Sequence, residues 1–167
     1  YHTIKQQANN NAKFLIFDIP EVLPLSAYFL MSSFPNKTIR LFGEDTISAD
    51  PSEKYDIGLF PHFTISKLSD SSIDLFYNSC SFSEMDEKCS AEYLTIIERT
   101  CRKYLIHDNH DTDHVFTYSD GSTSKNIRGS KFVPNTEIFK RIYKKPRVHS
   151  RPEDKSFTHY EYLYERM

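Results

Sequence analysis

The sequence has few glycines and lacks any long apolar run. Only four of its 167 residues are glycine, and none of them belongs to a Gly-rich loop. No stretch approaches the roughly eighteen consecutive apolar residues of a membrane span, and we expect no secretory leader. The chain is long enough for one domain with a hydrophobic core, and its aromatic residues are all Phe and Tyr.

An excess of positive charge is also missing. The net charge is −2, whereas a dedicated nucleic-acid binder usually has a strongly basic balance, so we expect no nucleic-acid partner. The basic residues gather late, in "KRIYKKPRVHSR" at 140–151. We interpret this stretch as a solvated segment, with a local anion site as the second alternative.

The sequence has few cysteines, and their number and spacing do not suggest disulfide bonds. The three cysteines, Cys80, Cys89 and Cys101, form an odd set without C-x-x-C spacing. This usage is typical of free thiols in a reducing compartment, so we expect a cytoplasmic protein. Cys89 and Cys101 have the spacing of an apolar helix face, whereas Cys80 follows a predicted strand.

Strand and helix patterns alternate along the chain. The apolar run of "KFLIFD", at 14–17, is typical of a strand buried on both faces of a parallel sheet. Apolar residues at helical spacing follow at 21–33 and, most clearly, at 86–103. We expect further strands at 37–43, 55–63, 73–79 and 104–109, a short helix at 135–143, and an antiparallel closing strand at 157–166. This order predicts an α/β fold with a doubly wound, mainly parallel sheet.

Polar side chains stand where several predicted strands end. They are Asp18, His62, Asn78 with Ser79, and the trio His107, Asp108 and Asn109. Ligands of parallel α/β sheets bind beyond the carboxyl ends of the strands, so these residues are candidates for a site. Asp18 could accept hydrogen bonds from ribose hydroxyls, or it could cap the helix that follows.

Two segments resemble a known family. "FLIFDIPEVLPLSAYFL", followed later by "IDLFYNSCSFSEM" and a helix, is similar to the S-adenosylmethionine-dependent sugar O-methyltransferases, over roughly residues 13–110. The resemblance implies the seven-stranded methyltransferase version of the doubly wound sheet. It also implies that Asp18 binds the cofactor ribose, that His62 and Phe63 line the adenine, and that Asn78 and Ser79 lie beside the methionine part.

The sequence departs from this family at its start. The family's first strand and its Gly-rich loop are not seen, and "YHTIKQQANNNA" matches only the helix that follows them. We therefore expect an incomplete sheet, with residues 1–167 forming a single partial methyltransferase domain of a longer protein. The missing strand would be the central one, between the strands that begin near Phe14 and Ile73.

Glu84 and the stretch "YLIHDNHDTDHVF" at 104–116 hold the remaining candidates. The resemblance places Glu84 near the general base of related enzymes, but Ser81 and Glu84 also form a capping-box pattern. The second stretch could suggest a metal site, yet it reads as a strand end followed by a long loop, so we predict no metal. We predict instead that His107 or Asp108 faces the substrate, with a role in proton transfer.

These observations predict an O-methyltransferase that uses S-adenosylmethionine and acts on a hydroxyl of a sugar or glycan precursor. A base near the acceptor is needed because the alkoxide is the better nucleophile. The alternative is a catalytically inactive fragment, or a partner domain that completes another subunit. A homo-oligomer is a further arrangement that the sequence leaves open.

Overall fold

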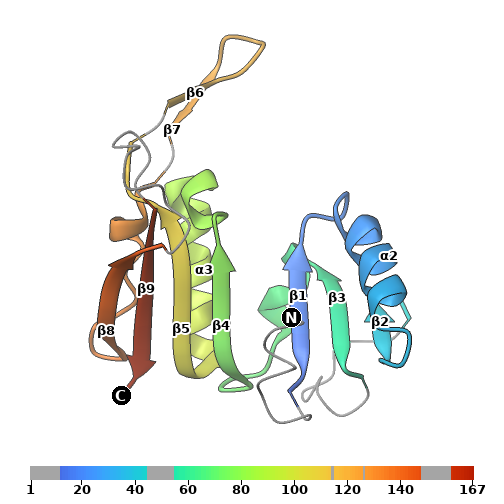
Figure 1. The fold of residues 1–167 in the computed structure, drawn as a ribbon. Coiled ribbons are helices and arrows are strands. Elements are labelled where there is room, and N and C mark those ends of the chain that lie inside the picture. The colour runs from blue at the N-terminus through green and yellow to red at the C-terminus, as the bar shows by residue number, and fades with distance from the viewer. Residues whose placement is uncertain (1–11, 45–54, 114, 126, 148–158) are drawn as a thin grey trace. The chain divides into compact units, whose positions relative to one another are not determined.

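The computed structural model, drawn as a ribbon in Figure 1, divides into two compact units, Tyr1–Ser69 and Asp70–Met167. Each unit has its own hydrophobic cluster. Among the residues that it describes, no helix is both long and apolar enough to cross a membrane. The structure describes residues 12–44, 55–113, 115–125, 127–147 and 159–167.

The first unit is built on a parallel sheet of three strands in the order β1-β3-β2. These are Phe14–Asp18 (β1), Ile57–Pro61 (β3) and Ile39–Leu41 (β2), and the helix Leu23–Ser33 (α2) packs on the sheet. The pairing of β1 with β3 confirms the predicted parallel strand at the start of the chain, but β1 is partly buried along its whole length rather than buried on both faces. A 3-10 helix, His62–Lys67, continues directly from the end of β3.

A glycine in the middle of β3 is explained by the aromatic residues around it. A Cβ atom at Gly58 would lie 2.4 Å from Phe60 Cε2 and 2.7 Å from Tyr55 Cε2. Real Cβ atoms do not approach other atoms so closely, so a side chain at this position would push both rings aside. Gly58 therefore lets two buried rings cover the strand.

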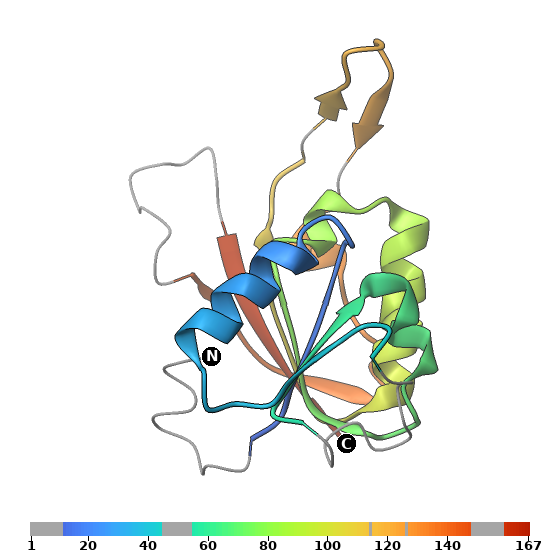
Figure 2. The ribbon, with the colours of Figure 1, turned by 90° about the vertical axis from the view of Figure 1, so that its right-hand side faces the viewer.

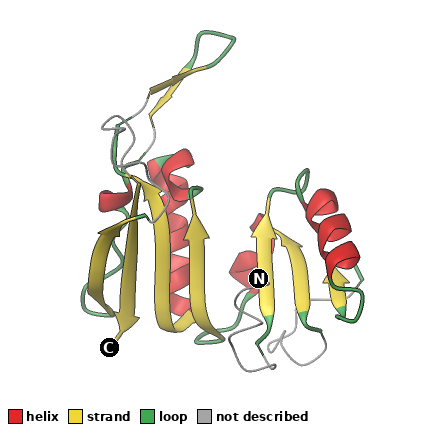
Figure 3. Ribbon diagram, viewed as in Figure 1, coloured by secondary structure: helices red, strands yellow, loops and turns green. Residues whose placement is uncertain are grey.

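The second unit contains a mixed sheet in the order β4-β5-β9-β8 (Figure 3). Ile73–Ser79 (β4) and Cys101–His110 (β5) are parallel, and His159–Arg166 (β9) pairs antiparallel with β5, as predicted for the closing strand. Phe139–Pro146 (β8) then pairs antiparallel with β9. The helix predicted at 135–143 is therefore wrong, because strand pairing with β9 outweighs a short helical pattern.

The main helix of this unit, Glu87–Thr100 (α3), begins and ends inside the predicted range. Its cap is Asp86, whose carboxylate accepts a hydrogen bond of 2.7 Å from the backbone N–H of Cys89. The predicted capping box of Ser81 and Glu84 is wrong, because Ser81 makes no side-chain cap bond and residues Phe82–Glu84 form a separate 3-10 helix. The next strand, β5, follows α3 without a loop.

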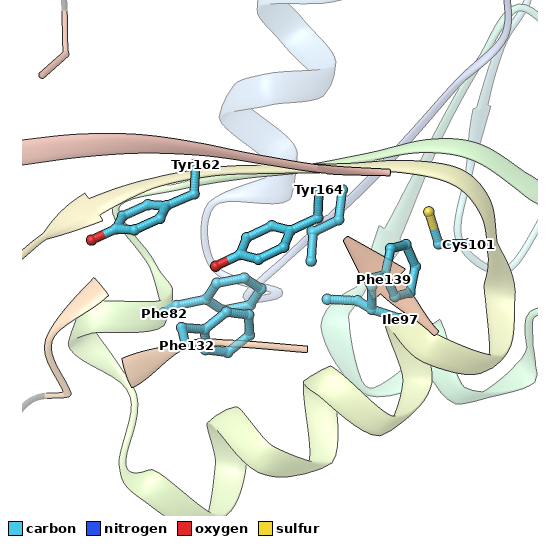
Figure 4. Packing of buried hydrophobic residues seen from close by; sticks show 8 residues of the cluster. Phe82, Ile97, Cys101, Phe132, Phe139, Tyr162 and Tyr164 are labelled. Atoms are coloured by element: carbon cyan, nitrogen blue, oxygen red, sulfur yellow. The ribbon is translucent and has the colours of Figure 1, made fainter. Parts of the chain in front are cut away.

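The core of the second unit is rich in aromatic rings (Figure 4). The rings of Phe82 and Phe132 stack with centroids 3.6 Å apart. Tyr162 and Tyr164 of β9 lie over this pair, and Ile97 of α3 is fully buried beside it. The cluster thus joins α3, β5, β9 and the segment that carries Phe132.

A hairpin lies within the segment predicted as a long loop. Val115–Thr117 (β6) and Thr123–Lys125 (β7) pair antiparallel and extend away from the rest of the second unit (Figure 2). The ion pair of Asp113 and Arg128 links the two ends of the hairpin segment, and a 3-10 helix, Gly129–Lys131, follows.

Candidate functional site

In the first unit, the predicted cofactor residues share the carboxyl edge of the parallel sheet. Asp18 ends β1 in register with Pro61, which ends β3, and His62 and Phe63 follow at once. The Phe63 ring is exposed and meets the exposed Phe42 ring edge to face, with centroids 6.0 Å apart. This edge thus presents a carboxylate, an imidazole and two aromatic rings.

Two details of this edge bear on ligand binding. The Asp18 carboxylate accepts a hydrogen bond of 2.8 Å from the N–H of Ile19, and α2 has no side-chain cap, so the alternative that Asp18 caps this helix is wrong. His62 Nδ1 is buried and has no hydrogen-bond partner within the part of the chain that the structure describes. A ligand atom could satisfy it, which fits the predicted binding of a nucleoside.

In the second unit, Asp108 is the centre of a polar cluster at the carboxyl ends of β4 and β5. The residue is only 2% exposed. Its Oδ2 accepts a hydrogen bond of 2.8 Å from the Tyr77 hydroxyl, and its Oδ1 accepts one of 2.9 Å from the Ser79 hydroxyl. The Arg147 guanidinium lies 3.4 Å from Oδ1 and balances the buried charge.

Cys80 follows Ser79 and joins the same cluster. Its thiol lies 3.3 Å from Arg147 Nη1, 3.8 Å from His159 Nε2 and 3.7 Å from Asp108 Oδ1. The backbone N–H of Cys80 donates to the carbonyl of Asp108 at 2.8 Å, which holds its left-handed backbone, with a φ of 61°. The chain therefore turns at Cys80 so that the thiol reaches residues of β5 and β9.

His107, one of the two residues predicted as alternatives to face the substrate, lies in the core. Its side chain is 0% exposed and stacks on the Tyr162 ring, with centroids 4.6 Å apart. Its Nδ1 lies 3.4 Å from the Asn109 amide nitrogen, which can only donate, so the proton of the neutral ring is on Nε2. Burial lowers the pKa of His107 to about 4. This position argues against the predicted substrate contact, because adjacent residues of β5 face opposite sides of the sheet.

The buried His107 predicts a loss of stability in mild acid. In the folded state the pKa of His107 lies below the ordinary value of 6.5. The contribution of the neutral ring to the free energy of unfolding is therefore complete above pH 6.5 and is lost as the pH falls toward 4. A shift of this size corresponds to about 3 kcal/mol. Urea unfolding at pH 7 and pH 4 measures the loss, and His107→Gln should reduce the difference between the two values. If the free energy of unfolding of His107→Gln fell as steeply with pH as that of the wild-type chain, His107 would not be the cause of the loss.

The two other predicted residues of this unit have different surroundings. The Asn78 amide oxygen accepts hydrogen bonds from the Asn109 side chain, at 3.2 Å, and from the backbone N–H of Phe82, at 3.4 Å. Asn78 therefore ties the end of β4 to β5 and to the following 3-10 helix. Glu84 is exposed on that helix, and its role as a base stays a prediction. No group of three or more His, Cys, Asp or Glu side chains within the described ranges could hold a metal ion.

Three residues of the Asp108 cluster were missed by the sequence analysis. Tyr77 lies two positions before Ser79 on β4 and so shares its face, which strand alternation could have indicated. Arg147 follows β8, and His159 begins β9. Nothing local in the sequence places these two beside Cys80, because their position depends on antiparallel pairing with β5 and β9.

Comparisons with known proteins show similarity in fold but not in sequence. No protein-family model matches the chain, and no curated protein matches it. The PH0226 protein from Pyrococcus horikoshii OT3 is 12% identical, with a TM-score of 0.52, and the match covers 99% of this chain and 87% of that one. The Burkholderia thailandensis 1,6-didemethyltoxoflavin-N1-methyltransferase, solved with S-adenosylhomocysteine, is 10% identical, with a TM-score of 0.52 and coverage of 99% and 75%.

These similarities establish the class of fold. The chain has a methyltransferase-type α/β fold, with mainly parallel strands followed by antiparallel last strands. The strand order in each unit agrees with the predicted doubly wound architecture.

Proposed function

We propose that this chain is an S-adenosylmethionine-dependent O-methyltransferase that acts on a hydroxyl of a sugar or glycan precursor. The observation that carries the proposal is the buried Asp108 carboxylate, which two hydroxyl groups contact at the carboxyl edge of a sheet of methyltransferase type. Ligands of such sheets bind at this edge. The solved Burkholderia enzyme with this fold contains S-adenosylhomocysteine, which supports the choice of cofactor.

We propose cofactor contacts for the residues of each unit separately. Asp18 would accept hydrogen bonds from the ribose hydroxyls, and His62 and Phe63 would contact the adenine. Asn78 and Ser79 would lie near the methionine part. When bound, the cofactor supplies an electrophilic methyl group on its sulfonium. The protein's own residues orient the acceptor hydroxyl and remove its proton.

Asp108 is the proton acceptor that we favour. Its carboxylate is too buried to meet a substrate directly, whereas the Tyr77 side chain is 56% exposed and donates to it. A hydroxyl of the acceptor that donates to Tyr77 Oη can pass its proton to Asp108 through this phenol. Because burial and the hydrogen bond to Asp108 raise the pKa of Tyr77, the phenol keeps its own proton at neutral pH and acts as a relay.

Calorimetric titration with S-adenosylhomocysteine tests cofactor binding. We expect binding by the wild-type chain and a roughly ten- to hundredfold weaker affinity for Asp18→Asn, because a hydrogen bond to a charged group contributes about 1.5–3 kcal/mol. Glu21→Gln is the matched control, since Glu21 is an exposed carboxylate three positions away. Absence of binding would instead favour the alternative, an inactive fragment or a domain that completes another subunit.

Three further expectations rest on this proposal. The partner is a sugar or glycan-precursor substrate rather than a nucleic acid, the compartment is the cytoplasm, and residues 1–167 act as one partial methyltransferase domain. A homo-oligomer would be detected by light scattering of the same preparation.

A further inference from the structure

Cys80 follows β4, and the polar groups around its thiol come from three other strands or their ends. The thiol contacts the Arg147 guanidinium, after β8, and the His159 imidazole, on β9. The Asp108 carboxylate, on β5, also lies within reach of the sulfur. The side chain of Cys80 is partly exposed, so a small molecule can reach it.

We propose that Cys80 is a nucleophilic thiol that hydrogen peroxide oxidises to a sulfenic acid, with His159 as its proton acceptor. The arrangement has the parts of an activated nucleophile: a thiol, a base at hydrogen-bonding distance for sulfur, and a cationic donor. This role is independent of methyl transfer, and it would put an oxygen atom beside Asp108.

The groups around the sulfur suit this reaction. Burial and the nearby Arg147 lower the pKa of His159, so its imidazole is neutral near pH 7 and can take a proton. The Arg147 N–H that points to Sγ stabilises negative charge on the sulfur as it develops. The charge of Asp108 opposes this effect, but Asp108 is itself paired with Arg147 and accepts hydrogen bonds from Tyr77 and Ser79.

The reaction balances with peroxide as the only oxidant. His159 Nε2 takes the thiol proton, Sγ attacks one peroxide oxygen, and the S–O bond forms as the O–O bond breaks. The sulfur gives up two electrons, and the departing hydroxide takes the proton from the imidazolium to form water. The products are a sulfenic acid at Cys80 and one water molecule.

The other two cysteines provide internal controls. Burial together with the carboxylates of Asp86 and Glu92 raises the pKa of Cys89, and burial raises the pKa of Cys101. The Cys101 thiol is fully buried and donates to the backbone carbonyl of Tyr104 at 3.0 Å. Both thiols are therefore expected to react slowly with peroxide.

Peptide mass spectrometry after treatment with peroxide and dimedone tests the proposal. We expect Cys80 to be labelled at least about ten times faster than Cys89 or Cys101 in the folded chain, and all three at similar rates in guanidinium chloride. His159→Gln should slow the labelling of Cys80 several-fold and leave Cys89 unchanged, with circular dichroism as the check on folding. Equal labelling of the three cysteines in the folded wild-type chain would overturn the proposal, as would a rate at Cys80 unaffected by His159→Gln.

Discussion

Asp108→Asn should slow methyl transfer by about one hundred- to ten-thousandfold, the usual contribution of a positioned proton acceptor. An asparagine keeps only one of the two side-chain oxygens as an acceptor, and it cannot take a proton. Because Asp108 is only 2% exposed, we expect the loss in kcat, with the affinity for S-adenosylhomocysteine nearly unchanged. Transfer of a labelled methyl group to the acceptor measures kcat, and calorimetry measures the affinity.

Two variants separate this role from a structural one. Tyr77→Phe removes the hydroxyl that donates to Asp108 and should reproduce part of the loss in kcat. Asp113→Asn changes an exposed carboxylate that pairs with Arg128 on the hairpin segment, and it should leave kcat within about twofold. A kcat of Asp108→Asn within about twofold of the wild-type value would remove Asp108 from the proposed reaction.

Asp108 and His107 lie on opposite faces of β5, because successive side chains of a strand alternate between the two faces of the sheet. Leu105, His107 and Asn109 lie two positions apart on β5, and all three are buried on the face that carries the aromatic core. Asp108 lies on the opposite face with the partner strand's Ser79. Two adjacent titratable residues at a strand end therefore have different environments. The sequence does not show which of the two faces the core, because Leu105 shares the face of His107 and the equally apolar Ile106 shares the face of Asp108.

The parallel part of the fold follows from local patterns. The apolar run 14–17 predicts β1, and the helical spacing at 86–103 predicts α3, because burial on one or two faces imposes those periods. The carboxyl ends of parallel strands meet at one edge, so the exits of β4 and β5 could be placed together without a structure. This is why Ser79 and Asp108, 29 positions apart, could be selected as one site.

The contacts made by the last two strands could not be predicted in this way. Arg147 and Cys80 are 67 positions apart, and Cys80 and His159 are 79 positions apart. Their approach depends on the pairing of β8 with β9 and of β9 with β5, and the first half of β8 lies in the segment 135–143 that was predicted as a short helix. Long-range strand pairing overrides a local preference of a few residues, so the basic stretch at 140–151 was interpreted as a solvated segment.

Phe132→Ala should lower the free energy of unfolding by about 3–5 kcal/mol, the usual cost of removing a buried aromatic ring. Phe132 is 2% exposed and stacks on Phe82, and its ring also meets the edge of His107, with centroids 5.4 Å apart. Since the chain has no tryptophan, urea unfolding is followed by circular dichroism. The adjacent Val133→Ala is the matched control, because Val133 is 39% exposed and should lose less than about 1 kcal/mol.

The same substitution connects packing with protonation. Without the Phe132 ring, water can reach His107, and the burial that lowers its pKa is reduced. We therefore expect the stability of Phe132→Ala to depend less on pH between 4 and 6.5 than that of the wild-type chain. A loss below about 1 kcal/mol, or an undiminished pH dependence, would show that the Phe82–Phe132 stack is not what keeps His107 dry.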